Sequence, residues 1–224
     1  SIEGIAMSRS SQGHLAMLLF SALVAGSFAL GVLAANELAP GALNAVRFWI
    51  ATCVVGAAVM MTGGINRKSL EASWRYPVLA LPFIIYFVLM FEGLKTAPAV
   101  SAAAVFTLTP IMSAAFGWLL LRQKTNLRII MALIIGGIGA IWVIFRAAIA
   151  ALLNFDVGRG EAIYFIGCIA HAIYTPLVAK MNKGERAVEF TFLTLIAGSI
   201  LLTIWAAPEL SSANWSSLPP IVWI

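Results

Sequence analysis

The chain has 224 residues, of which 62% are apolar and only 10% are charged. A soluble domain carries about 25% charged residues, so this composition excludes an ordinary soluble enzyme or binding domain and indicates a protein built for lipid. The formal net charge of +5 does not indicate nucleic-acid binding, because the basic residues form short clusters between apolar segments. Cys53 and Cys168 both lie within apolar segments, which favours packed thiols over a disulfide or a metal site.

Seven apolar segments follow one another along the chain, each long enough to cross a ~30 Å hydrocarbon layer as a helix. A signal peptide is the alternative interpretation of the first segment, but its apolar run exceeds the roughly 7–15 residues of a signal-peptide core. The residues before Met7 are interpreted as a remnant of an expression vector, and Leu218 to Ile224 as the start of an eighth segment. The predicted helices are Leu15–Ala35, Ala42–Met61, Pro77–Leu94, Pro98–Leu121, Ile129–Phe145, Glu161–Val178 and Ala187–Ala207.

The fourth segment, Pro98–Leu121, carries no charge and has Pro110 at its middle. A proline in that position usually breaks a soluble helix but is tolerated in a membrane helix. The sequence therefore predicts one spanning helix here, forming a hairpin with the helix before it.

The basic residues predict the orientation of the helices. Ten of the fourteen Lys and Arg fall on one side of the predicted bundle, in the connections after the second, fourth and sixth helices and at the N-terminus. Since cytoplasmic loops are enriched in Lys and Arg, we expect these connections and the N-terminus to be cytoplasmic, in a cell inner membrane. The four exceptions are Arg47, Lys95, Arg146 and Arg159.

A weak internal similarity relates the segment from Gly13 onward to the segment from Gly160 onward. A five-helix unit has an odd number of spans, so its second copy must enter the membrane from the opposite side. This arrangement predicts an all-α bundle of two inverted repeats, ten helices in a complete chain, and a substrate site near the midplane. The predicted divisions are 1–13 for the vector remnant and N-terminus, 14–146 for the first repeat, 147–160 for an external connection and 161–224 for the truncated second repeat.

An ordered set of short motifs resembles the EamA-like family of the drug/metabolite transporter superfamily. The motifs, in chain order, are Gly26-Ser27-Phe28, Arg47-Phe48, Glu92-Gly93-Leu94-Lys95, Ala97-Pro98-Ala99, Thr109-Pro110, Arg122-Gln123-Lys124 and Gly136-Gly137-Ile138-Gly139. The resemblance implies a ten-helix inverted-repeat transporter with cytoplasmic termini that exports amino acids or other metabolites. The aromatic-rich pattern is most similar to the aromatic amino acid exporter branch, although Ala25 and Gln123 depart from the usual family residues.

Four residues are candidates for a substrate site. His171 lies near the centre of a predicted helix with Tyr174 one turn later, and an ionisable group at that depth normally faces a cavity or a partner. Tyr86 and Phe83 lie on a corresponding stripe of the third helix. For His171 the alternative is a neutral side chain bonded to a neighbouring helix, and for Tyr86 it is simple packing, although its buried hydroxyl needs a partner.

Three charged residues, Arg47, Glu92 and Lys95, are expected toward the external face. One interpretation is structural: a charge extending to the membrane surface, or a pair that holds two helices together. The other is a gate that breaks when the transporter opens.

These observations predict a secondary transporter of small metabolites, either an exporter or a facilitator, that works by alternating access. An aromatic site with few fixed charges favours an aromatic or other hydrophobic amino acid, with a drug or a sugar as an alternative. Proton antiport and facilitated diffusion both remain open, with His171 as the obvious proton carrier. A membrane-embedded enzyme is the alternative class, but the chain has no catalytic or cofactor-binding motif, and we expect no enzyme activity, cofactor or metal. The expected partners are a small-molecule substrate and the bilayer, not nucleic acid, and the oligomeric state is left open with a monomer among the options.

Overall fold

The computed structural model describes residues 9–146, 149–153 and 157–223, which contain only helices and their connections. Six helical spans are long and apolar enough to cross a membrane. They are α2 (Pro40–Met61), α3 (Arg75–Leu94), α4 and α5 taken together (Ala99–Leu121), α6 (Leu127–Ile144), α8 (Arg159–Met181) and α9 (Ala187–Trp205).

The first predicted segment is also helical, as α1 (Arg9–Ala34), but it is not counted among the six spans. The shorter elements are η1 (Arg67–Leu70), α7 (Ile149–Leu153), α10 (Ala207–Ser212), η2 (Trp215–Ser217) and η3 (Pro220–Trp223). The stretch predicted to open an eighth helix is thus a 3-10 turn over its described part. The ten-helix count, the inverted repeat and the proposed divisions of the chain remain predictions, and residues 1–6 lie outside the described range.

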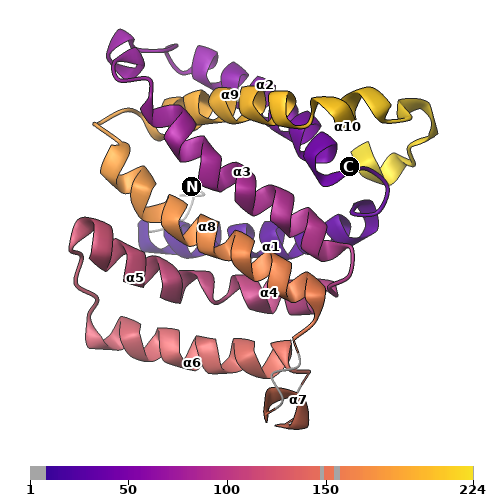
Figure 1. Cartoon of the computed structure of the whole chain (residues 1–224). Coiled ribbons are helices and arrows are strands. Elements are labelled where there is room, and N and C mark those ends of the chain that lie inside the picture. The colour runs from indigo at the N-terminus through magenta and orange to yellow at the C-terminus, as the bar shows by residue number, and fades with distance from the viewer. Residues whose placement is uncertain (1–8, 147–148, 154–156, 224) are drawn as a thin grey trace, which may run out of the picture.

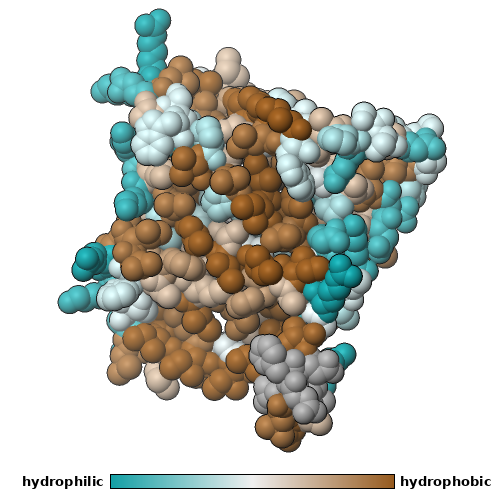
Figure 2. Space-filling model, viewed as in Figure 1, coloured by the Kyte–Doolittle hydropathy of each residue, from teal (hydrophilic) through white to brown (hydrophobic). Residues whose placement is uncertain are grey.

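The spanning helices run side by side and alternate in direction (Figure 1). Hydrophilic residues gather at the two ends of the bundle, with a hydrophobic band between them (Figure 2). The connections 62–74, 122–126 and 182–186 all lie at one end, which we call the basic-loop end. The sequence therefore grouped these basic connections correctly, while the side of the membrane they face stays a prediction.

The predicted continuous helix Pro98–Leu121 is interrupted, which corrects the sequence-based interpretation. It consists of α4 (Ala99–Phe106) and α5 (Thr109–Leu121), separated by a tight turn. In that turn Leu108 N–H donates to the carbonyl of Val105 at 3.1 Å, a spacing of three residues instead of four. Pro110 lacks an N–H group and cannot bond the carbonyl of Phe106, so the helix loses its ladder at this point.

The helices α3 and α8 form the centre of the structure because they approach each other closely along their length. At one end, Gly93 and Gly160 leave no space for a side chain: a Cβ on Gly93 would lie 2.7 Å from the carbonyl oxygen of Gly160. Further along, a Cβ on Gly167 would lie 3.2 Å from the carbonyl oxygen of Tyr86. Glycines on the facing side of α8 therefore allow the side chains of α3 and α8 to form one shared core.

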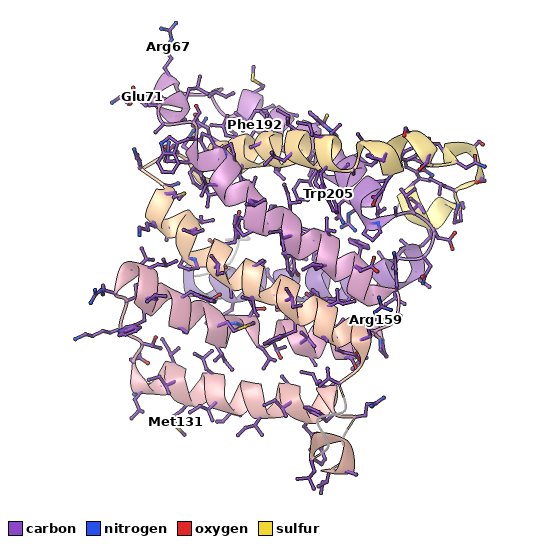
Figure 3. The ribbon with its side chains drawn as sticks, viewed as in Figure 1. Arg67, Glu71, Met131, Arg159, Phe192 and Trp205 are labelled. Atoms are coloured by element: carbon purple, nitrogen blue, oxygen red, sulfur yellow. The ribbon has the colours of Figure 1, made fainter. Side chains whose placement is uncertain are left out.

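By contrast, α6 lies at the edge of the bundle and carries mostly exposed apolar side chains. Met131, which is 51% exposed, points away from the other helices (Figure 3). Such a surface suits contact with lipid.

Candidate functional site

The four predicted substrate residues lie together between α3 and α8. The ring of His171 is 4.7 Å from the ring of Tyr86 and 6.0 Å from that of Tyr174 (centroid distances). Tyr174 in turn stacks on Phe83 at 4.8 Å with an interplanar angle of 20°. The sequence therefore grouped residues that do share one cluster, and whether they bind substrate stays a prediction.

Tyr164 belongs to this cluster and was missed by the sequence analysis. Its hydroxyl and that of Tyr86 form a hydrogen bond of 2.9 Å, and both side chains are buried. The partner expected for the Tyr86 hydroxyl is thus a second tyrosine rather than an open cavity. Tyr164 lies seven residues before His171 on α8, two helical turns away on the same face, and this spacing was the available signal.

A groove of about 790 Å³ lies beside the aromatic cluster, between α5, α6 and α8. Its inner part is formed by Phe106, Thr109 and His171, and the ring of Phe106 is 5.5 Å from that of His171. Its other part reaches Gln123 and Lys124 in the 122–126 connection, at the basic-loop end. The helix interruption lies at the inner part of this groove, since Thr109 begins α5.

Two polar atoms at the inner part of the groove are poorly satisfied. Nδ1 of His171 is buried and makes no hydrogen bond within the described residues. Oγ1 of Thr109 is also buried without a hydrogen bond of ordinary geometry, and only the thiol of Cys168, a weak partner, interacts with it. An unpaired buried polar atom costs about 1–3 kcal/mol, so both atoms favour a ligand or water that bonds them.

The charges around the groove restrict what it can hold. Lys124 is the one charged residue among the side chains that line it, and no carboxylate is among them. The groove therefore favours a neutral, zwitterionic or anionic ligand over an organic cation. Among the described residues there is also no group of three His, Cys, Asp or Glu that could hold a metal ion.

The three residues predicted as either gating or structural charges do not line this groove. Glu92 and Lys95 form an ion pair of 2.8 Å within one turn at the end of α3, and both side chains are partly exposed. The pair therefore does not join two helices, which corrects that interpretation. The guanidinium of Arg47 lies over the ring of Phe91, 4.8 Å from its centroid. Arg47 also lines a separate groove of about 440 Å³ between α1, α2 and the C-terminal 3-10 turns.

A buried ion pair lies at the basic-loop end, where the sequence analysis used the charges only to predict orientation. Arg75, at the start of α3, pairs with Glu185 at 2.6 Å, and their side chains are 1% and 6% exposed. Burial by itself would raise the pKa of the Glu185 carboxyl. Hydrogen bonds from Arg75 and from the backbone N–H of Lys183 outweigh burial, so that the pKa of Glu185 lies below its ordinary value.

Sequence comparison identifies the family of the chain. Residues 11–145, more than half of the chain, match the EamA-like transporter family. The chain belongs to this family. It is also 24% identical over 212 residues to the "Uncharacterized transporter YyaM" of Bacillus subtilis (strain 168), covering 94% of this chain and 70% of that protein. No solved structure matches the chain.

Family membership and the six apolar spans together make the chain a membrane transporter. The resemblance inferred from the short motifs is thereby confirmed at the level of the family, and a transporter is favoured over an enzyme. The aromatic amino acid exporter branch is not part of what the comparisons show.

Proposed function

We propose that this EamA-family protein is a secondary transporter of an aromatic or other hydrophobic amino acid, with its substrate site at the inner part of the groove. The observation that carries the proposal is the buried, unpaired Nδ1 of His171 beside a groove with mostly apolar walls. A substrate with an apolar body and a polar end would fill the walls and bond the histidine. In this proposal the protein lies in the inner membrane, with its basic-loop end cytoplasmic.

The aromatic cluster behind the groove has a positioning role in this proposal. Tyr86 packs edge-on against His171, and Tyr174 is held in turn by its stack on Phe83. These contacts restrict the imidazole to one orientation, so that its free nitrogen stays directed at the substrate. The substrate ammonium has no carboxylate partner among the groove residues, and the carbonyls at the helix interruption are the available acceptors.

Alternating access completes the proposal. The groove reaches the basic-loop end through the 122–126 connection, whereas the opposite end of α3 and α8 is closed by the contact of Gly93 with Gly160. These features support a state that is open toward the basic-loop end. Transport then requires a second state in which the groove closes at this end and the site opens at the other.

A counter-flow assay in proteoliposomes tests the proposal. Proteoliposomes that contain the purified protein are loaded with unlabelled solute. Uptake of labelled phenylalanine, threonine and a sugar into them is then compared with and without a pH gradient. We expect counter-flow of phenylalanine in the wild type, a loss of tenfold or more in His171→Ala, and no change in His14→Ala, an exposed histidine outside the groove. Counter-flow of the sugar alone, or equal activity of His171→Ala and the wild type, would contradict the proposal.

The pH gradient separates the two modes of energy coupling. Insensitivity of phenylalanine counter-flow to the gradient would favour a facilitator. Dependence on the gradient that disappears in His171→Gln would favour a proton-coupled mechanism with His171 as the carrier.

A further inference from the structure

The buried ion pair at the basic-loop end joins α8 to α3. Nη1 of Arg75 donates to the carbonyl of Met181, the last residue of α8, at 2.6 Å, while Nη2 bonds Glu185 in the following connection. The same guanidinium donates to the carbonyls of Ala72 and Glu71, each at 3.1 Å. Most ion pairs at a protein surface are exposed and weak, but this one is almost fully enclosed, so it holds one defined geometry.

The opposite ends of α3 and α8 are joined in a different way. There the two backbones are in direct contact at Gly93 and Gly160. A contact between backbones has no side chain that can rotate away, so it behaves as a fixed point about which α8 can tilt. Pro176 lies inside α8 between the two attachments and cannot bond the carbonyl of Ala172, which accepts instead from the hydroxyl of Ser113 at 3.4 Å. The helical hydrogen-bond ladder of α8 is therefore interrupted at this point, where bending is easiest.

The next helix is attached independently of this ion pair. Arg186 donates to the carbonyls of Thr62 and Gly64 after the end of α2, and Glu189, in the first turn of α9, accepts from the backbone N–H of Asn66 at 2.6 Å. Loss of the Arg75–Glu185 pair would therefore leave α9 attached to α2. The end of α8 would then be held only by the Arg75–Met181 hydrogen bond and by apolar packing against α3 and α9.

The position of the end of α8 determines the width of the groove. Thr175, Pro176 and Ala179 of α8 line one side of it, and Leu121 and Ile129 line the other. Movement of this end toward α5 would narrow the groove from the basic-loop end inward.

We propose that the Arg75–Glu185 pair is a latch that holds the end of α8 against α3, keeps the groove open at the basic-loop end, and breaks when the transporter changes state. The inference rests on the proposed function of the groove, because only a transporter needs the groove to close. It assigns the gating role to this pair instead of to Arg47, Glu92 and Lys95. The latch predicts that neutralising Glu185 shifts the population toward a narrowed groove.

Distance measurements test the latch without any substrate. Spin labels are placed at Lys180→Cys, near the end of α8, and Arg128→Cys, on α6 across the groove, in full-chain protein in nanodiscs with Cys53 and Cys168 replaced by Ala. Pulsed electron paramagnetic resonance then reports the distribution of the label distance. In Glu185→Gln we expect a new, shorter population.

Two controls keep the test specific. Glu92→Gln removes one carboxylate from the exposed pair at the other end and is expected to leave the distribution unchanged. Glu185→Asp keeps the charge but shortens its reach, and provides a milder variant in case Glu185→Gln does not fold. Its expected distribution lies between those of the wild type and the neutral variant.

The outcomes separate the latch from the proposed function. Identical distributions in the wild type, Glu185→Asp and Glu185→Gln overturn the latch, whatever the transport activity. A shorter population in Glu185→Gln together with absent wild-type counter-flow overturns the proposed function and leaves the latch standing. A shorter population together with altered phenylalanine counter-flow supports both.

Discussion

Gly160→Ala is the substitution for which the structure gives the clearest expected cost. A Cβ at this position would overlap the carbonyl oxygen of Gly93 and lie 2.6 Å from the backbone nitrogen of Ala97, where ordinary contacts are 3.4–4 Å. Adding a methyl group to a well-packed site costs about 1–3 kcal/mol, and backbone neighbours cannot rotate away, so we expect the upper end, about 3 kcal/mol. For a chain of this length, about 2–4 °C per kcal/mol gives a fall in Tm of roughly 6–12 °C.

The assay uses the buried thiol of the protein itself. In a Cys53→Ala background, Cys168 is fully buried and reacts with a thiol-reactive fluorophore only when the fold opens, so heating in detergent reports Tm. The matched control is Gly136→Ala on α6, where an added Cβ meets nothing within 4 Å and Tm should stay or rise. Equal Tm values for Gly160→Ala and Gly136→Ala would refute the close approach of α3 and α8.

Three further predictions concern the site, the ion pair and the helix interruption. Tyr86→Phe should lower the unfolding free energy by about 1–3 kcal/mol, because it leaves the buried hydroxyl of Tyr164 without its partner. The double variant Tyr86→Phe/Tyr164→Phe should cost less than the sum of the two single changes, and chemical unfolding of the wild type, both single variants and the double variant measures this coupling. The pKa of Glu185 is lower in the folded state than in the unfolded state, so its contribution to stability is present above the ordinary glutamate pKa and is lost as the pH falls through the folded pKa. Glu185→Gln should therefore flatten the decrease of Tm in the acid range below the ordinary glutamate pKa, and an equal decrease in both proteins would show that the pair with Arg75 is absent in solution. Pro110→Ala restores a backbone N–H that can bond the carbonyl of Phe106, so we expect a higher Tm and new amide-exchange protection at residue 110. Counter-flow should become slower, and unchanged transport would show that the interruption is not needed for function.

The substrate cluster was partly predictable from the sequence. His171 and Tyr86 stand out because a titratable or hydroxyl group in the middle of an apolar segment needs a reason to be there. Tyr164 carries the same hydroxyl but is near the start of its helix, where a polar group needs no special partner, and was passed over. Only the packing of α8 against α3 brings Tyr164 to the hydroxyl of Tyr86.

The two ion pairs differ in how far the sequence could predict them. Glu92 and Lys95 are three residues apart, and their pairing could be expected from helix geometry. Arg75 and Glu185 are separated by 110 positions, and the sequence counted Arg75 only as one basic residue of a cytoplasmic loop. The residues next to Arg75 in the sequence do not indicate that its guanidinium becomes almost fully buried, since this depends on how the end of α8 packs against α3.

The sequence by itself determined the class of the protein, the positions of the helices and the sorting of the basic connections to one end. These properties depend on the length and composition of consecutive segments, which the lipid solvent selects locally. The tertiary structure alone decided which residues surround His171 and which charges are buried together. These features depend on how closely two helices can approach, and here the glycines of α8 permit a contact with α3 that hydrophobic periodicity does not encode.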